Sequence, residues 1–346
     1  MVYNSVLVRG AGPTYSATPG THPLIPEDVS REIVKSTTED SAVLSMFKHR
    51  TMSSAQQRMP VLATKPQAYF VTGLSGDPRA DTGWKQTTSI AWANKFLDAE
   101  ELAVIVPVPE KLLDDVDYDI WGEIKPEIVE AMAVALDAAV LFGFNSPASW
   151  PNSIVEGALA VGNVVIQGTG IDVADDINSV MAAVEIDGFD VNGFFVKNSM
   201  KAELRGLRDL NQAFIYQPVT GVANTVYKGT IFGEKAVSSK SGIFEAEIAG
   251  DYGRTDGIKA IAGDWSQGII GIRQDLTWKM LDQAVITDAA GLVIWNLPQQ
   301  DMVAMRVVAR YGFQVPNPIN RMNMTETGAG GRYPFAVLQE EGAVIP

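Results

Sequence analysis

Few side chains in this sequence are of the kinds that perform catalysis or hold metals. It has no cysteine and only two histidines, His22 and His49, both within the first fifty residues. Thiolate nucleophiles, disulfides and cysteine-based metal sites are therefore excluded. With only two histidines, a Ser-His-Asp triad or a histidine-rich metal site has very few candidate residues. We interpret both histidines as ordinary surface or interface residues, and we expect neither a cofactor nor a bound metal.

Two stretches resemble ligand-binding loops only in part. Residues 157–162 have the glycine spacing of a phosphate-binding loop, but Asn163 and Val164 stand where lysine and serine or threonine are required. Residues 251–257 look like a calcium loop, yet the ligand spacing is wrong and no glutamate occupies the twelfth position. We interpret the first stretch as a turn of small residues and the second as an ordinary loop.

Two pairs of adjacent acids, Asp114–Asp115 and Asp175–Asp176, are the remaining candidates for acid–base chemistry. Neighbouring residues point apart, and acids are common at helix starts because the helix dipole favours them there. We interpret both pairs as dipole and solvation features. Together these observations favour a protein that is not an enzyme.

The composition restricts the partners of the chain. Its 346 residues are 46% hydrophobic and 20% charged, as in folded globular proteins. The net charge is −14 with no basic block, which argues against a protein that wraps nucleic acid through clustered lysine and arginine. The N-terminus lacks a signal-peptide pattern and no stretch approaches the roughly 18 apolar residues of a membrane span. We therefore expect a soluble protein, made in the cytoplasm, without a membrane partner.

A long two-stranded hairpin is predicted between Arg58 and about Leu97. Apolar and aromatic runs flank the turn-rich stretch 76–83. Two arms of about a dozen residues would reach on the order of 40 Å, too far to pack on their own domain along their whole length. Because an isolated hairpin is marginal in water, it needs a partner. Trp84 and Trp92 of this hairpin are either buried against a neighbouring subunit or engaged in ordinary cross-strand pairs.

A long helix is predicted from Asp119 to about Phe142, where apolar residues recur near every fourth position until Gly143. Pro126 either kinks this helix or marks a later start. A strand at 102–108 precedes the helix. Residues 1–23, rich in glycine, proline, serine and threonine, are predicted to form an extended arm, followed by a short helix that opens at Leu24.

The middle of the chain alternates helix and strand, which predicts a mixed α+β domain with a central sheet. Asp172 can cap a helix, residues 194–196 form a buried strand, and a second helix begins at Ser199. Further strands are expected near 230–232, 258–262, 269–272 and 276–281. The long apolar strand at 302–315 should pack beside the helix at 119–142, so we expect a discontinuous outer domain with the middle domain inserted into it.

The order of these parts resembles the Hong Kong-type major capsid proteins of tailed bacteriophages, over residues 24 to 322. The segments that carry the resemblance include Leu24-Ile25-Pro26-Glu27, the hairpin, Glu110–Asp115 and Leu141-Phe142-Gly143. Two further phrases are typical of such capsids: Ala260–Ser266 followed by Gly271-Ile272-Arg273, and Gln300–Arg306. The resemblance implies an α+β capsid fold.

By that resemblance the chain divides into the parts of a capsid subunit. They are an N-terminal arm (1–23), a peripheral domain in three pieces (24–67, 98–149 and 286–322) with a long spine helix, an extended hairpin loop (68–97), an inserted axial domain (150–285) and a C-terminal tail (323–346). Candidate interface residues are Trp84, Lys85, Trp92, Lys95, Arg306 and Arg310.

The implied function is self-assembly into pentamers and hexamers of an icosahedral shell around double-stranded DNA. The shell would be built in the bacterial host cytoplasm and remain as the virion capsid, and we hypothesise that its acidic wall is repelled by the DNA, which it encloses without reading its sequence. Further candidate partners are a separate scaffolding protein, a portal and a decoration protein. Many family members begin with a helical scaffolding segment that is later cut off, whereas this chain enters the arm almost directly, so either the scaffold is a separate protein or the chain is a processed form.

Some members join their subunits by a lysine–asparagine isopeptide bond assisted by a glutamate. Lys85 or Lys95 could supply the amine and Asn317 the acceptor, but no motif supports this pairing, so no catalytic residue is carried over. Two other functions stay open. One is an encapsulin-like nanocompartment shell on the same fold, and the other is a cytoplasmic α/β hydrolase or nucleotide-binding enzyme, against which the shortage of histidine and the missing phosphate loop argue.

Overall fold

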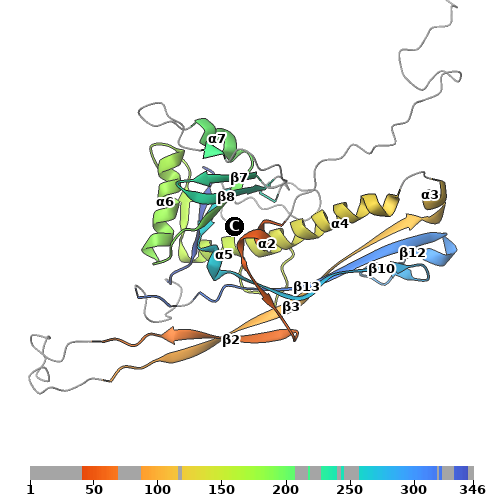
Figure 1. Ribbon diagram of the computed structural model, residues 1–346, viewed down its shortest axis with the longest axis horizontal. Helices are drawn as coiled ribbons and strands as arrows, with labels where there is room; N and C mark the ends of the chain where they lie inside the picture. The colour runs from red at the N-terminus through yellow and green to blue at the C-terminus, as the bar shows by residue number, and fades with distance from the viewer. Residues whose placement is uncertain are drawn as a thin grey trace, which may run out of the picture. The chain divides into compact units, whose positions relative to one another are not determined.

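The described residues build two sheets, of five and seven strands, and a separate two-stranded ribbon (Figure 1). The computed structural model describes residues 41–68, 87–115, 119–206, 217–218, 227–239, 243–244, 257–317, 319–321 and 331–341, which all belong to one unit, Thr38–Pro346. The mixed α+β class is as predicted. The predicted arm, the helix opening at Leu24 and His22 lie outside the described residues, as does nearly all of the loop at 251–257.

The five-stranded sheet contains, in spatial order, β1 (Lys48–Thr51), β10 (Ile269–Leu281), β13 (Met302–Gln314), β3 (Ala91–Pro109) and β2 (Gln56–Thr64). Neighbouring strands are antiparallel except for β1, which is parallel to β10. The strand β3 is continuous over 19 residues: residues 99–109 pair with β13 and residues 91–98 with β2. The separation that we predicted between the hairpin arm and a strand at 102–108 is therefore wrong, because the polar residues between them simply continue the ladder.

The predicted long helix is α4 (Ile120–Asp137), continued by a π-helical turn, η2 (Ala138–Phe142). Gly143 ends it with a φ of 79°, a conformation that glycine adopts without a Cβ penalty. The helix runs through Pro126, so a later start is excluded. One face of α4 shares a core cluster with β13, as predicted for the long final strand (Ile128, Met132 and Leu136 with Met305, Val307 and Ala309).

Two short helices flank the spine helix. The helix α3 (Glu110–Asp115) ends, rather than begins, with the pair Asp114–Asp115. The dipole interpretation of this pair is therefore wrong, although Asp114 is exposed, as solvation requires. The helix α2 (Ala42–Met46) is tied to the end of α4, because the buried carboxylate of Asp137 accepts hydrogen bonds from Ser41 Oγ (2.5 Å), Ala42 N (2.8 Å) and Val43 N (3.2 Å). These three donors compensate a charge that would otherwise be costly to bury.

The seven-stranded sheet has the spatial order β4 (Val164–Ile166), β14 (Phe335–Gln339), β9 (Ile258–Gly263), β5 (Gly193–Lys197), β8 (Glu234–Ser239), β7 (Tyr227–Ile231) and β6 (Gln217–Pro218). Its helices are α5 (Ile154–Val161), α6 (Val173–Ile186) and α7 (Met200–Gly206). As predicted, Asp172 caps α6 by accepting from Asp175 N, residues 194–196 are a buried strand, and a helix follows Ser199.

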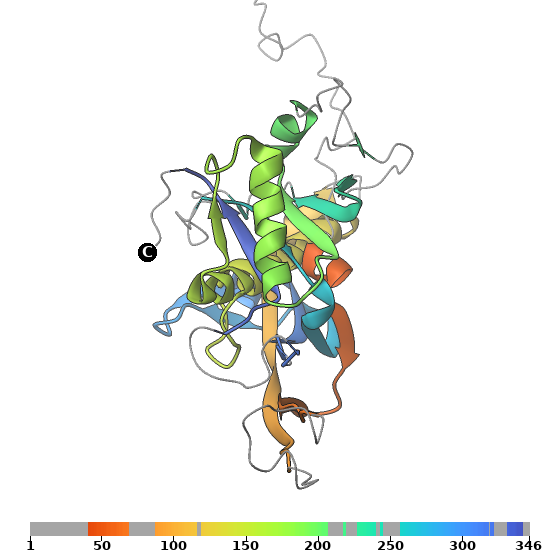
Figure 2. The same ribbon diagram turned by 90° about the vertical axis from the view of Figure 1, so that its left-hand side faces the viewer.

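Alternating residues of the central strands face two different cores, as the two-residue period of a strand requires. Phe195, Ile261 and Val337 belong to the larger cluster, which also contains residues of α4 and α5. Phe194, Ala262 and Leu338 belong to a smaller cluster with α6 and α7. Figure 2 shows α6 lying across this face of the sheet. The sheet is therefore covered on both faces.

The stretch at 157–162 is not the turn that we predicted, because most of it lies in α5. Ser153 starts this helix with a capping box: its Oγ accepts from Glu156 N, while Ser153 N donates to the Glu156 carboxylate. Small residues concealed the helix in the sequence. Gly157 is required there because the ring of Tyr333 occupies the place of a Cβ.

Two strands differ from their predicted places. Residues 269–272 and 276–281 form one strand, β10, and β10 joins the five-stranded sheet instead of the central sheet of the middle domain. The segment predicted as a C-terminal tail contains β14, which is buried between β4 and β9. Its residues Phe335, Ala336, Val337 and Leu338 have no exposed surface.

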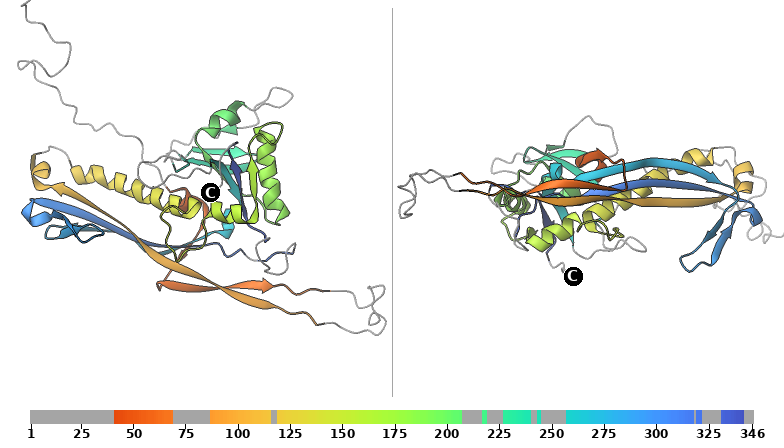
Figure 3. Two further views of the ribbon diagram at one scale, coloured as in Figure 1. Left: turned by 180° about the vertical axis from the view of Figure 1, so that it is seen from behind. Right: turned by 90° about the horizontal axis from the view of Figure 1, so that it is seen from below.

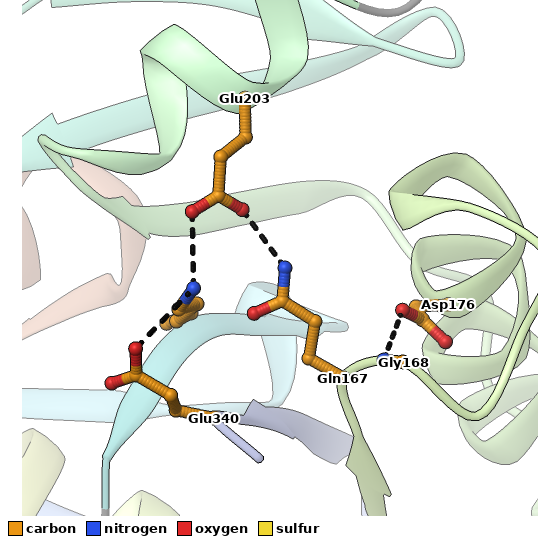
Figure 4. Close-up of polar contacts among 6 residues, drawn as sticks. Gln167, Gly168, Asp176, Glu203 and Glu340 are labelled. Atoms are coloured by element: carbon orange, nitrogen blue, oxygen red, sulfur yellow. Dashed lines mark hydrogen bonds and ion pairs between the residues drawn. The ribbon is translucent and has the colours of Figure 1, made fainter.

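A polar network holds the end of β14 and α7 to the sheet (Figure 4). Glu203 of α7 accepts hydrogen bonds from Gln167 Nε2 (2.9 Å) and from Lys259 Nζ (3.0 Å). Lys259 also lies 3.6 Å from a carboxylate oxygen of Glu340. Because Lys259 is almost fully buried, its two acidic partners are what make its charge tolerable there.

Candidate subunit interface

The predicted hairpin is a two-stranded ribbon formed by β2 and the first half of β3. Its register runs from Gln56 opposite Asp98 to Thr64 opposite Ala91, and the two strands continue side by side (Figure 3). Among the described residues no third strand pairs with this part of β3. The root of the ribbon has a small core of Met52, Met59 and Leu97. Beyond that core, the described residues offer the ribbon little to pack on.

One face of the ribbon carries large apolar side chains that are open to solvent. Leu62 stands opposite Trp92, and Arg58 opposite Phe96. Trp92 is 65% exposed and Phe96 45%, while Ile90, just before β3, is 54% exposed. Trp92 therefore has a cross-strand neighbour, as one of our two alternatives held, yet about two thirds of its surface stays uncovered. Large apolar surfaces left open in this way are typical of sites where another molecule binds.

The other predicted interface residues of the hairpin fall into two groups. Trp84 and Lys85 lie outside the described residues. Lys95 is half-buried on the opposite side of the ribbon from Trp92, facing Met59 of β2. Asn317, the imagined acceptor of a cross-link, uses its amide Nδ2 to donate to Arg332 O (2.9 Å), and Arg332 donates back to Asn317 O (3.1 Å). Its amide is thus engaged in joining two segments of its own chain.

Arg306 and Arg310 lie on β13, on the sheet face opposite α4. Arg310 forms an ion pair with its cross-strand neighbour Glu101, with Nη2 at 2.8 Å and Nε at 3.2 Å from the same carboxylate oxygen. Both side chains are about half exposed, so the pair contributes little to stability. Arg306 is exposed between Ile105 of β3 and Lys279 of β10. Their role at an interface stays a prediction.

A second exposed ribbon was missed in the sequence. It consists of β11 (Val285–Thr287) and β12 (Val293–Asn296), between β10 and β13 in the chain. The 3-10 turn η4 (Leu297–Gln299) follows it, and its root packs in a small cluster with Leu297, Met302 and Ala304. Its outer apolar side chains are 38–68% exposed (Val285, Leu292, Val293, Ile294, Trp295). In the sequence, the apolar run 292–295 resembles a buried strand. Only the structure, in which no described element covers this ribbon, identifies it as exposed.

A groove runs along the spine helix on the side of α2 and β10. It has a volume of about 290 Å³ and a largely apolar lining that includes Leu44, Val129, Met132, Leu276 and Tyr311. Burial, followed by the charge of Asp275, raises the pKa of Tyr311 above its usual value. The lining is mostly aliphatic and aromatic, so the groove is suited to apolar contacts.

The described residues contain no candidate metal site. No group of three or more histidine, aspartate or glutamate side chains is placed to hold a metal ion in this part of the chain. His49 is exposed on β1, in agreement with a surface histidine. Within the same residues no helix is long and apolar enough to cross a membrane. What the geometry offers is exposed apolar surface on thin ribbons.

Comparisons with known proteins agree on one family. The model of the phage capsid family matches residues 22–321. The major capsid protein of Staphylococcus phage 80alpha is 26% identical over 291 residues, which cover 82% of this chain and 79% of that protein. A solved structure from Microbacterium phage Oxtober96 is 37% identical with a TM-score of 0.71, covering 92% of this chain and 97% of that one. One from Mycobacterium phage Adephagia is 28% identical with a TM-score of 0.73, covering 93% and 96%.

Proposed function

The chain belongs to the phage capsid family and is a major capsid protein, and from this premise we propose that its copies form pentamers and hexamers of a closed icosahedral shell around double-stranded DNA. Its fold is the Hong Kong-type capsid fold that the sequence predicted. The homologues are structural capsid proteins, so neither the nanocompartment nor the enzyme alternative is favoured.

The observation that carries this proposal is the open apolar face of the β2–β3 ribbon. Leu62, Trp92 and Phe96 stand on one face of two strands that have no third strand beside them among the described residues. A two-stranded ribbon is marginally stable alone, and its exposed aromatic residues cost solubility unless they are covered. In a shell of identical copies, the surface of a neighbouring copy covers them.

The division of the subunit into domains follows the two sheets. The five-stranded sheet with α4 matches most of the predicted peripheral domain, and the seven-stranded sheet with α5, α6 and α7 matches most of the predicted axial domain. The predicted hairpin loop was 68–97, and the pairing of β2 with β3 supports a start near residue 56 instead. The strand β10 supports a boundary near residue 268 rather than 285, because it joins the five-stranded sheet. The strand β14 supports extending the axial domain to include it, because β14 lies within the seven-stranded sheet.

The remaining partners follow from the role of a shell wall. A separate scaffolding protein would direct closure, a portal would occupy one vertex, and a decoration protein would bind outside. Assembly would take place in the host cytoplasm. The net charge of −14 supports a wall that encloses DNA without binding it tightly, because like charges repel.

The test is to express the full chain, purify it by sedimentation, and examine it by electron microscopy. We expect uniform closed shells made of five- and six-fold clusters, either from the chain alone or once its scaffolding protein is coexpressed. Coexpression with the other structural proteins of the phage should give DNA-filled particles. A chain that stays monomeric at every concentration, with or without those proteins, would contradict the proposal.

A further inference from the structure

The turn between β7 and β8 holds a bulky residue in a conformation that such residues avoid. Ile231 stands opposite Glu234, so the turn consists of Phe232 and Gly233 alone. Their φ angles are 51° and 92°, as in the type I′ turns that usually contain asparagine followed by glycine. The other non-glycine residues with positive φ in the described chain are Asn145, Asp301 and Asn317, which tolerate this region. Phe232 is the exception, because its side chain is large.

Phe232 gains little within its own subunit in return for this strain. Its side chain is 47% exposed, and a Cβ added to the adjacent Gly233 would meet no atom within 4 Å. A strained backbone and an open aromatic ring both destabilise the isolated subunit, and asparagine would avoid both. Strain of this kind persists where function requires it. The benefit of a phenylalanine is therefore expected outside the subunit.

The β4 edge of the same sheet, in the half away from the Phe232 turn, presents an aliphatic surface. At one edge of the seven-stranded sheet β6 pairs with β7, and at the other edge lies β4. Ile166, the last residue of β4, is 46% exposed, and Ile171 in the loop that follows is 97% exposed. A single exposed aliphatic residue is common on protein surfaces, but Ile166 and Ile171 lie in one short segment and together offer an apolar surface that another molecule could cover.

The loop that carries Ile171 is held in place by two carboxylates. Asp176, which is 1% exposed, accepts hydrogen bonds from Gly168 N and Gly170 N, both at 2.8 Å, and the first of these is drawn in Figure 4. Asp175 accepts from Ile171 N at 3.2 Å. Asp176 is thus a buried clamp and not the solvation feature that we predicted. A surface fixed in advance binds with a smaller loss of entropy.

The two surfaces also differ in charge. The sequence has no lysine or arginine between Lys125 and Lys197. All charged residues of β4, the Ile171 loop and α6 are therefore acidic. The hairpin of β7 and β8 contains Lys228 and Lys235 against a single acid, Glu234. An acidic aliphatic surface and a weakly basic hairpin with an aromatic turn are complementary, which favours a second copy of this chain as the partner over an unrelated molecule.

We propose that the Phe232 turn of one copy docks on the Ile166–Ile171 surface of the next copy. Because the two surfaces are different and belong to opposite halves of one sheet, the contact is head-to-tail, and its repetition can close a ring such as a pentamer or hexamer. The inference rests on the proposed function and names one contact within its pentamers and hexamers. The strained turn is then the cost of presenting an aromatic ring to the neighbouring copy.

The decisive variant is Phe232→Asn, which relieves the strain and removes the ring. We expect the melting temperature of the unassembled subunit to rise by about 2 °C, while the subunit concentration required for shell assembly rises about tenfold. Phe232→Tyr retains the ring and should assemble like the wild type. Should Phe232→Asn subunits assemble at the wild-type concentration, the contact is refuted.

A double-mutant cycle tests the named partner surface. Ile171→Ser should raise the required concentration about tenfold in the wild type but add little to Phe232→Asn, because both remove one contact. Ile186→Ser, which changes a 71% exposed residue at the other end of α6, is the matched control and should have no effect. Independent, additive effects of Phe232→Asn and Ile171→Ser would refute the pairing while wild-type shells still support the proposed function. Absence of wild-type shells would instead overturn the proposed function itself.

Discussion

Replacing Trp92 by serine should impair shell assembly far more than subunit folding. Trp92 is 65% exposed in the subunit. A tryptophan offers up to about 250 Å² for burial, so about 160 Å² of this side chain remains open. At about 25 cal/mol per Å², complete burial against a neighbouring copy would contribute about 4 kcal/mol per contact. Partial burial places the expected loss between about 2 and 4 kcal/mol, the range of interface hot spots.

The loss within the subunit should be smaller, because only about 90 Å² of the side chain is already covered, largely by the ribbon itself. That area corresponds to about 2 kcal/mol at most. Trp150→Phe is a suitable control for folding. It removes the hydrogen bond from Trp150 Nε1 to Asp98 O (3.1 Å), which should cost the subunit about 1 kcal/mol and leave assembly unchanged.

The assay follows the fraction of sedimenting shells against total subunit concentration, together with guanidinium unfolding of the unassembled subunit. For Trp92→Ser we expect the concentration at half assembly to rise at least 30-fold, the factor that about 2 kcal/mol implies at room temperature. If shells form at the wild-type concentration while the isolated subunit is destabilised, Trp92 stabilises its own ribbon rather than an interface, and the reasoning is refuted.

Deleting residues 74–88 should leave a soluble subunit that fails to close shells, because it removes the turn-rich part of the predicted hairpin; normal shells in electron micrographs would count against an interface role. Asp137→Ala should lower the unfolding free energy by about 1–3 kcal/mol in guanidinium titrations, since three donors at the start of α2 lose their acceptor. Burial, followed by the charge of Glu156, raises the pKa of Tyr333 far above its usual value of 10. The unfolded tyrosine releases its proton near pH 10 while the folded one retains it, so this contribution to stability is complete below pH 10 and declines above it by about 1.4 kcal/mol per pH unit. Tyr333→Phe should remove that decline, and an unchanged slope would mean that another group causes it.

Regular elements with a strong period were predictable from the sequence. The apolar residues of α4 and the long run of β13 identified both elements, and Gly143 marked the end of the helix. The sheet to which each strand belongs was harder to predict from the sequence. The strand β10 follows β9 closely in sequence yet pairs with β13, because its partner is set by contacts far along the chain. No local pattern distinguishes the two sheets.

Two further misses have local causes. The helix α5 is short and rich in small residues, so its period was hidden, and its capping box of Ser153 and Glu156 was the signal that could have revealed it. The strand β14 follows a stretch without clear pattern and lies within the predicted C-terminal tail, although the run Phe335-Ala336-Val337-Leu338 is apolar throughout. A continuous apolar run of this kind is typical of a strand buried on both faces.

The interface could be predicted only in part, for a reason that lies in the chemistry of assembly. A side chain buried against a neighbouring copy is selected for the same apolar character as one buried in its own core, so Trp92 and Val293 look like core residues in the sequence. Topology separates the two cases. A strand within a covered sheet finds its core in its own chain, whereas the β2–β3 and β11–β12 ribbons lack a covering layer among the described residues. If the ribbons were instead covered by their own chain in solution, their aromatic residues would be protected in the monomer as well. Solvent accessibility of Trp92 that falls only on assembly is therefore the measurement that distinguishes an interface from a core.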